Sequence, residues 1–278
     1  MKAQVRNINS RVNPEEQVHI SYSQLSTYLL CPMKYAHSYV YGTAWEQKPV
    51  ALIFGQAIHR AVEQYYLYRK DTDDTIPIGH LIDFFRQSLD HGFKDNEVPI
   101  SFKKGETANH LQSQGTELLK LFHAEVIPQQ IIEVEKSFSV PIPDLTGMYK
   151  ELPVRLVGRL DLIEADTDGT YMIVELKTAA QRYNALRIET DLQSTVYSYA
   201  MSQMNHATSE NSCLIRYDVL LKTKEPAFEH YFVTRSERDH NRLIELLNQV
   251  LAAIEHRIFY RQTGWACADC QFRKTCLG

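Results

Sequence analysis

The chain has 278 residues, of which 44% are apolar and 23% charged, and these values are typical of a globular protein. Its formal net charge of −4 excludes a global positive field, so any contact with nucleic acid must come from local basic patches. We find neither an apolar run of about eighteen residues nor a charged-then-apolar leader, and therefore expect no membrane span and no secretory signal. Five cysteines are too few and too clustered for a disulfide scaffold, and without a leader we expect a reducing, cytoplasmic location.

Hydrophobic periodicity predicts helices first, then strands, a helix, further strands and a closing helix. In chain order the expected segments are a tail or weak strand over 1–20, a helix from Ser21 to about Cys31, a helix from about Phe54, a loop over 71–77, helices near 78–91 and 106–126, strands near 131–140, 152–164 and 170–177, a helix near 187–204, strands near 213–221 and 230–233, and a helix near 236–259. Gln24 stands three places after Ser21, which predicts a capping box at the first helix. This order predicts an α/β fold with one main core and a helical part inserted before the central sheet.

The segment 171–177 is expected to form a buried strand that nevertheless carries two charges. Because strand side chains alternate between faces, Glu175 and Lys177 share one face, while Met172, Val174 and Leu176 share the other. Burial of an unpaired charge costs several kcal/mol or more of folding free energy, so charges inside an apolar strand indicate a functional role. The alternative interpretation is a pair of edge-strand charges that water solvates.

Asp161 lies in a second apolar run, over 156–163, and the turn signal at 166–169 predicts that the two runs pair as a hairpin. Such a hairpin would bring Asp161 close to Glu175 and Lys177. Two carboxylates beside a lysine indicate a divalent-cation site with a cationic group for a water or a phosphate.

Other side chains are candidates for the same site. Gln193 and Tyr197 are four residues apart on an expected helix and so share a face. His59 is a candidate nitrogen ligand, although a single helical histidine is more often packed or solvated than metal-bound. Glu135 is expected to be structural.

The C-terminal cysteines form the pattern C-x2-C-x5-C, made by Cys267, Cys270 and Cys276, and Cys31 lies far upstream. This spacing indicates a metal, and a zinc ion and a 4Fe–4S cluster fit four thiolates equally well on chemistry alone. Three unrelated thiols are the alternative. Cys213 lies in an apolar segment and is expected to be a buried core thiol.

Several of these segments appear in the order of a known family. They are Phe54-Gly55-Gln56-Ala57-Ile58-His59, Gly158-Arg159-Leu160-Asp161-Leu162-Ile163, Glu175-Leu176-Lys177 and Gln193-Ser194-Thr195-Val196-Tyr197, together with 21–35 and the terminal cysteines. The chain resembles the RecB-type branch of the PD-(D/E)xK nuclease superfamily along nearly its whole length, although residues 70–130 contribute no motif. The resemblance implies one nuclease domain over 1–278, with a restriction-endonuclease-like α/β core, a mixed central sheet flanked by helices, and a helical insertion over 70–130.

The resemblance also implies a role for each matching residue. The ligands of Mg²⁺ or Mn²⁺ would be His59, Asp161, Glu175 and the backbone carbonyl of Leu176. Lys177 would position or activate the attacking water and offset charge on the phosphate. Gln193 and Tyr197 would orient the nucleic-acid strand or the catalytic groups.

For the cysteines, the resemblance favours iron over zinc. One N-terminal and three C-terminal cysteines match the iron–sulfur-clasped nucleases, which include the CRISPR-associated exonucleases and the AddB nuclease domain. Cys31, with Cys267, Cys270 and Cys276 of the segment 260–278, would then hold a 4Fe–4S cluster that joins the chain ends. Such a clasp closes a long loop and so stabilises both termini.

The implied activity is metal-dependent hydrolysis of DNA, by an exonuclease that prefers single strands or free ends and serves CRISPR adaptation or recombinational repair. Helicase, recombination or CRISPR-adaptation proteins would be its partners. Two other interpretations stay open: a catalytically silent DNA-binding subunit that keeps the fold, and a zinc-clasped structural partner in a repair complex.

Overall fold

The computed structural model describes residues 18–95, 97–204 and 213–278, and these form two compact units. The sheet unit comprises residues 47–137 and 159–235, and the terminal unit comprises the remaining segments, up to residue 46, 138–158 and 236–278. Strands β4 (Gln130–Val140) and β5 (Arg155–Ala165) each pass from one unit into the other.

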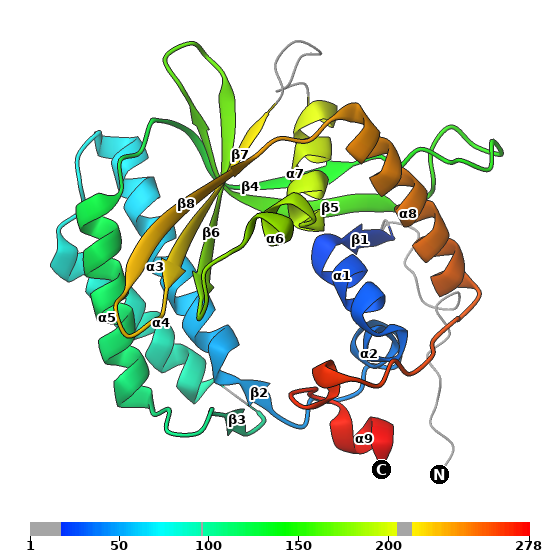
Figure 1. Ribbon diagram of the computed structural model, residues 1–278, viewed down its shortest axis with the longest axis horizontal. Coiled ribbons are helices and arrows are strands. Elements are labelled where there is room, and N and C mark those ends of the chain that lie inside the picture. Colours follow the sequence, from blue (N-terminus) through cyan, green and yellow to red (C-terminus); the bar gives the residue numbers. More distant parts are fainter. Residues whose placement is uncertain (1–17, 96, 205–212) are drawn as a thin grey trace. The chain divides into compact units, whose positions relative to one another are not determined.

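The sheet unit is built on a mixed sheet (Figure 1). Its further strands are β6 (Tyr171–Ala179), β7 (Leu214–Leu221) and β8 (Ala227–Val233). In the order β5-β6-β7-β8, the outer pairs are antiparallel and the β6–β7 pair is parallel, while β4 pairs with β5. The expected hairpin of β5 and β6 is present, with Leu162 opposite Val174 and Ala165 opposite Tyr171.

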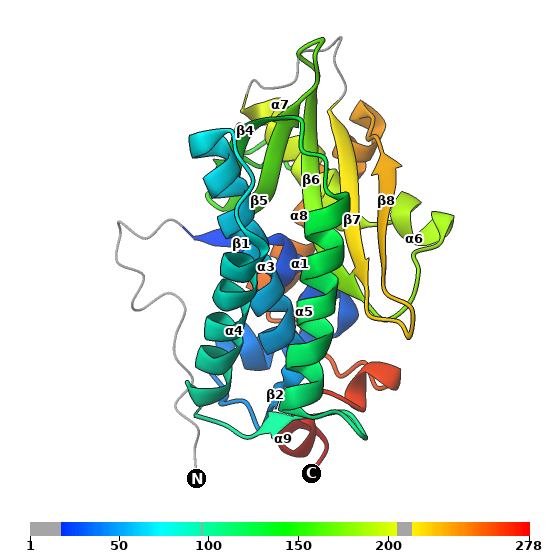
Figure 2. The ribbon, with the colours of Figure 1, turned by 90° about the vertical axis from the view of Figure 1, so that its left-hand side faces the viewer.

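Three long helices cover one face of this sheet, and Figure 2 shows them side by side. They are α3 (Val50–Thr72), α4 (Ile78–Lys94) and α5 (Ala108–Glu125), and a short strand pair, β2 (Lys48–Pro49) with β3 (Ile100–Ser101), lies at their ends. Their apolar side chains recur at helical spacing, and Phe54, Phe85 and Phe122 are fully buried. Two shorter helices, α6 (Ala185–Glu189) and α7 (Leu192–Gln203), lie on the opposite face (Figure 1).

Strand β6 separates the apolar core from the polar side of the sheet, as alternation predicts. Met172, Val174 and Leu176 are buried in the core formed with α3, α4 and α5. Glu175 and Lys177 point to the other face, where both contact α7 through Gln193. Alternate residues of β6 therefore pack in the apolar core, and the residues between them contribute to the polar site on the other face.

The terminal unit brings together segments from both ends of the chain. Its elements are β1 (His19–Ser21), α1 (Tyr22–Leu30), α2 (Pro32–Tyr35), a π-helical turn (Ala36–Val40), α8 (Glu237–Glu255), a 3-10 turn (Trp265–Cys267) and α9 (Arg273–Leu277). The predicted capping box is confirmed: the Gln24 N–H donates to Ser21 Oγ at 3.2 Å, and the Ser21 N–H donates to Gln24 Oε1 at 2.7 Å.

Hydrogen bonds hold these distant segments together. The Tyr28 hydroxyl donates to the Ile258 carbonyl at 2.8 Å, and the Met33 N–H donates to the Tyr260 carbonyl at 3.1 Å. The carboxylate of Glu46 accepts hydrogen bonds from the backbone N–H groups of Lys274 and Thr275, at the start of α9. The first cysteine and the last three therefore lie in segments that protein contacts alone already bring together.

The α/β architecture with a mixed sheet is confirmed, and several expected boundaries are wrong: β5 begins three residues later, β8 begins three residues earlier and α8 ends four residues earlier than expected. The helix expected from about Phe54 begins at Val50, directly after Pro49. The helix expected over 187–204 is two helices, because the chain breaks at Thr190 and Asp191 and Asp191 caps α7.

Part of the tail expected over 1–20 lies outside the described residues. The single-domain organisation with an insertion stays a prediction. In the ranges described, no helix is both long enough and apolar enough to cross a membrane.

Candidate active site

Asp161 stands where the β5–β6 pairing stops. It is the next residue beyond the Leu162–Val174 pair, and its Oδ2 accepts a hydrogen bond from the Leu176 N–H at 3.0 Å. The carboxylate is therefore fixed against the backbone of β6, beside Glu175. Burial, and then the charge of Glu175, raise the pKa of Asp161 well above its ordinary value.

Glu175, Lys177 and Gln193 form a closed hydrogen-bonded group on the α7 face. The Lys177 ammonium donates to Glu175 Oε1 at 2.6 Å and to Gln193 Oε1 at 2.7 Å. The Gln193 amide donates to Glu175 Oε1 at 2.7 Å and to the Tyr197 hydroxyl at 2.7 Å. These bonds fix the orientation of the Gln193 amide and of the lysine, so four of the predicted site residues meet at one point.

The electrostatics of this group keep Lys177 charged. Burial alone would lower the pKa of its ammonium, but the charge and hydrogen bond of Glu175, with the charge of Asp161, raise that pKa above its ordinary value. Burial and the same two carboxylates raise the pKa of Tyr197, so its hydroxyl stays neutral.

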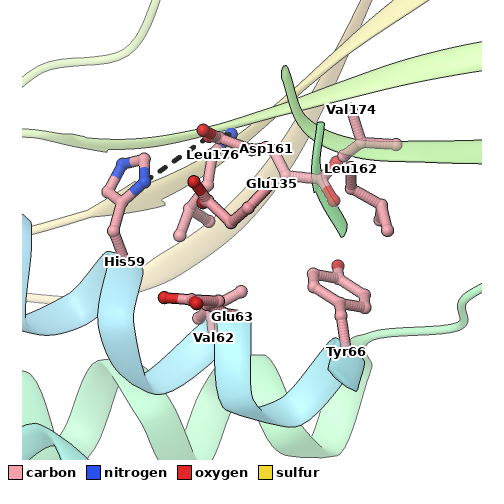
Figure 3. Close-up of a pocket in the computed structure, with 10 residues that line it drawn as sticks. His59, Val62, Glu63, Tyr66, Glu135, Asp161, Leu162, Val174 and Leu176 are labelled. Carbon is pink, nitrogen blue, oxygen red and sulfur yellow. Dashed lines mark hydrogen bonds and ion pairs between the residues drawn. The ribbon is translucent and has the colours of Figure 1, made fainter. Parts of the chain in front are cut away.

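His59 approaches the site from α3, as Figure 3 shows. Its Nδ1 lies 3.5 Å from Asp161 Oδ2, and its side chain is 34% exposed. Burial lowers the pKa of the imidazole, which favours the neutral form that binds metals.

Two carboxylates that the sequence interpretation left out line the same cavity. Glu63 follows His59 by one helical turn on α3, and this spacing was the signal that could have identified it. Glu135 points toward His59 and Asp161 (Figure 3) and accepts a hydrogen bond from Arg159 at 3.1 Å. Glu135 has a left-handed backbone with φ of 52°, which breaks strand alternation, so no pattern in the sequence predicts where its side chain points.

The donor set fits a hard divalent cation. Glu175 is 3% exposed, and its buried Oε2 has no hydrogen-bond partner among the described residues. A buried, unpaired carboxylate oxygen is costly, and oxygen ligands from Asp161 and Glu175 with one imidazole suit Mg²⁺ or Mn²⁺. As they stand, no three histidine, cysteine or acidic side chains of the described segments are arranged to hold a metal ion, so the ligand set stays a prediction.

The four predicted clasp cysteines line a single cavity of the terminal unit. Cys31, Cys267, Cys270 and Cys276 all carry free, partly exposed thiols there. Burial raises the pKa of the Cys276 thiol. The charge of Arg261 acts in the opposite direction, and the neighbouring Cys31 and Cys270 raise this pKa further. Four thiols around one cavity fit zinc and a 4Fe–4S cluster equally well. The fifth cysteine, Cys213, is buried, as expected.

The chain is similar to solved structures and to one family model. A crystal structure of a candidate exonuclease from Eubacterium rectale shares 15% identity, with a TM-score of 0.48, over 92% of this chain and 87% of the other. A crystal structure of the protein SSO0001 shares 14% identity, with a TM-score of 0.39, over 92% of each chain. No curated protein matches the sequence. The family model of the PD-(D/E)XK nuclease superfamily matches residues 19–277. The chain belongs to the PD-(D/E)XK nuclease superfamily.

Proposed function

We propose that this protein is a metal-dependent nuclease that hydrolyses the phosphodiester bonds of DNA. The observation that carries the proposal is the meeting of Asp161, Glu175, Lys177 and Gln193 at the end of the β5–β6 pairing. A buried carboxylate with one unpaired oxygen, beside a lysine that stays charged, is suited to bind a cation and an anionic phosphate together.

The cation would be Mg²⁺ or Mn²⁺, held by Asp161, Glu175, His59 and the backbone carbonyl of Leu176. When bound, such an ion polarises the scissile phosphate and lowers the pKa of a bound water. The protein's own contribution is to fix these ligands: the Leu176 N–H orients Asp161, and Gln193 orients Glu175.

Lys177 would stabilise the negative charge that develops on the phosphate and position the attacking water. Its ammonium is held by Glu175 and Gln193, so it needs no reorganisation during the reaction. Gln193 and Tyr197 share one face of α7 and are hydrogen-bonded to each other, which suits a role in orienting the lysine and the strand.

We further propose that the protein belongs to the RecB-type branch and acts as an exonuclease on single-stranded DNA. Support comes from the ordered motifs around His59, Asp161, Glu175, Gln193 and Tyr197, which match that branch. A role in CRISPR adaptation or recombinational repair, with helicase, recombination or CRISPR-adaptation partners, belongs to the same proposal and rests on the resemblance.

The cysteine cavity is proposed to hold a 4Fe–4S cluster rather than zinc. Cys31, Cys267, Cys270 and Cys276 supply four thiols around one cavity, which supports either group. The resemblance of their order, one N-terminal and three C-terminal, to that of the iron–sulfur-clasped nucleases is the reason to favour the cluster. The cluster would act as a structural clasp within the terminal unit. Metal analysis and the visible absorption of the anaerobically purified protein separate iron from zinc.

The test is a cleavage assay with the anaerobically purified full chain. End-labelled linear DNA, single- and double-stranded, and circular single-stranded DNA are incubated with Mn²⁺ or Mg²⁺, beside Lys177→Ala. We expect linear single strands to be degraded, circles to survive, and the variant to be slower by about 10²- to 10³-fold. Cleaved circles would contradict the exonuclease. Intact DNA with the cluster present would favour a catalytically silent DNA-binding subunit.

A further inference from the structure

A row of side chains extends from the candidate active site across the α7 face of the sheet. In the strand register Glu175 on β6 lies opposite Tyr217 on β7, and Tyr217 lies opposite Tyr231 on β8. Cross-strand partners point to the same face, so this row leads from the carboxylate site to the outer strand of the sheet.

Tyr183 packs onto this row from the loop between β6 and α6. Its ring stacks on Tyr231, with centroids 5.7 Å apart and an angle of 28° between the rings, and lies 6.4 Å from the ring of Tyr217. The Tyr183 N–H also donates to the Tyr231 hydroxyl at 3.2 Å. With 8% exposure and contacts on two strands, Tyr183 is a fixed platform rather than a side chain free to move.

Arg187 lies on that platform. The central carbon of its guanidinium is 3.6 Å from the centroid of the Tyr183 ring, and its backbone N–H donates to Asn184 at 2.8 Å, which fixes the first turn of α6. A guanidinium that stacks on a ring keeps the N–H groups along its edges free for other acceptors. Arg187 is exposed, so those edges face solvent.

The neighbouring Arg182 gives a contrast. Its Nε lies 2.7 Å from Glu229 Oε1, so a carboxylate already neutralises it. In the segments that the structure describes, Arg187 has no carboxylate within ion-pair distance and contacts Tyr183 instead. Arg187 therefore has an unneutralised charge on a fixed support, which is the arrangement expected of an anion-binding residue.

Electrostatics link Arg187 to the site. Burial raises the pKa of the Tyr183 hydroxyl, and the charges of Arg187 and then Lys177 oppose that increase, so both cations act on the same ring.

We propose that Arg187 binds a backbone phosphate of the nucleic-acid strand, next to the phosphate that Lys177 contacts. This inference rests on the proposed function and adds a substrate-positioning residue to it. The planar guanidinium would contact two phosphate oxygens side by side, while stacking on Tyr183 fixes its direction. Because this contact involves no base, it would strengthen binding of every nucleic-acid sequence equally.

The test compares Arg187→Ala with Arg182→Ala, which removes the same charge five residues away. Binding of a fluorescent single-stranded oligonucleotide by the full chain in Ca²⁺ is measured at several salt concentrations, with thermal melting as a control for folding. Loss of one phosphate contact is expected to make the slope of log K against log salt shallower by about 0.7 for Arg187→Ala. We expect the wild-type slope for Arg182→Ala, because Glu229 already neutralises that charge.

An unchanged slope for Arg187→Ala, or an equal change for both variants, would overturn the proposal. Cleavage of the same oligonucleotide in Mn²⁺ separates this failure from failure of the proposed function. If wild-type protein cleaves DNA while Arg187→Ala keeps its slope, only the role of Arg187 is wrong. If wild-type protein neither binds nor cleaves the oligonucleotide, the nuclease proposal fails with it.

Discussion

Among single residues, Asp161, a proposed metal ligand, is expected to lower the stability of the metal-free protein. Its carboxylate is partly buried beside Glu175, with one hydrogen bond from the Leu176 N–H. Like charges close together in a partly buried site destabilise the folded state unless a cation lies between them. The metal-free protein should therefore gain stability when this charge is removed.

We expect Asp161→Asn to melt at a higher temperature than the wild type in a chelating buffer, with a gain of about 0.5–2 kcal/mol. The amide oxygen of asparagine can still accept the Leu176 hydrogen bond, while the repulsion with Glu175 disappears. Differential scanning fluorimetry checks this result. Leu162→Ala, at the next position, serves as the control, because loss of a buried leucine side chain should cost about 2–5 kcal/mol. A lower melting temperature for Asp161→Asn would contradict the repulsion.

The sequence alone could predict which residues of β6 meet α7, because alternation depends only on an extended backbone. Glu175 and Lys177 lie on the predicted face and reach Gln193. The sequence could not predict where the Glu135 side chain points, because this residue has a left-handed backbone with φ of 52°, which strand alternation does not anticipate. Glu63 could have been identified from its spacing to His59.

At the element scale, the packing of α4 against α5 depends on a single glycine. A Cβ added to Gly115 would lie 2.0 Å from Cζ of Phe85, whose side chain is fully buried. Gly79, near the start of α4, has open space around its Cβ position. The same substitution should therefore have opposite effects at these two helical sites.

Gly115→Ala is expected to destabilise the protein by about 1–3 kcal/mol through overpacking. Gly79→Ala should be neutral or stabilising by up to about 1 kcal/mol, because alanine favours the helix and nothing obstructs it. Urea unfolding of both variants measures the difference. Equal effects would show that the Phe85 ring can move aside, and would contradict close packing of the two helices.

A buried ionic network joins β5, β7 and β8. Arg216 contacts Asp218 through two nitrogens, at 2.8 and 3.1 Å, and contacts Glu164 at 3.1 Å. His230 Nδ1 lies 2.7 Å from Asp218 Oδ1. Glu164 and Asp218 are 0% and 1% exposed, so both carboxylates depend on the guanidinium for compensation.

Replacement of Arg216 by methionine should cost about 3–5 kcal/mol in the free energy of unfolding, because it leaves two buried carboxylates without their arginine partner. Arg182→Met removes an arginine whose side chain is 73% exposed, and should change stability by less than about 1 kcal/mol. Denaturant unfolding compares the two. If both variants were equally stable, the network would not be needed to hold the strands.

The break between α6 and α7 could not be predicted from the hydrophobic pattern of the sequence. Periodicity predicts one helix over 187–204, but Arg235 donates hydrogen bonds to the carbonyls of Ile188 and Asp191 and to the hydroxyl of Thr195. Arg235 is far along the chain from all three acceptors, so hydrophobic periodicity within the segment 187–204 could not predict the contacts that stabilise the break. Asp191 as a helix cap was the only local signal.

At the scale of the whole molecule, the terminal unit combines segments from both ends of the chain. The predicted cluster ligands Cys31 and Cys276 are in this unit, and none is in the sheet unit. The spacing of the cysteines is visible in the sequence. The hydrogen bonds of Tyr28 and Glu46, which also join the N-terminal and C-terminal segments, could not be predicted from it.

Removal of the proposed cluster should therefore loosen the terminal unit first. We expect chelator-treated protein, and a Cys276→Ser variant, to show faster hydrogen exchange in residues 18–46 and 236–278, with little change in β6 and β7. Hydrogen exchange with mass spectrometry locates the effect, and Cys213→Ser is the control because its thiol lies outside the cavity. Uniform loosening of the whole chain, or none, would contradict a local clasp.

The proposed chemistry depends on Asp161 and Glu175 holding a divalent cation beside Lys177 during hydrolysis of DNA. The most direct test is the single-turnover rate of single-stranded DNA cleavage as Mn²⁺ is titrated, for wild-type protein, Lys177→Ala and Asp161→Asn. We predict that Lys177→Ala lowers the maximal rate by about 10²- to 10³-fold with little change in the Mn²⁺ midpoint. Asp161→Asn should move the midpoint to at least about 10- to 100-fold higher Mn²⁺. A wild-type rate that does not depend on Mn²⁺, or a Lys177→Ala rate equal to wild type, would contradict the claim.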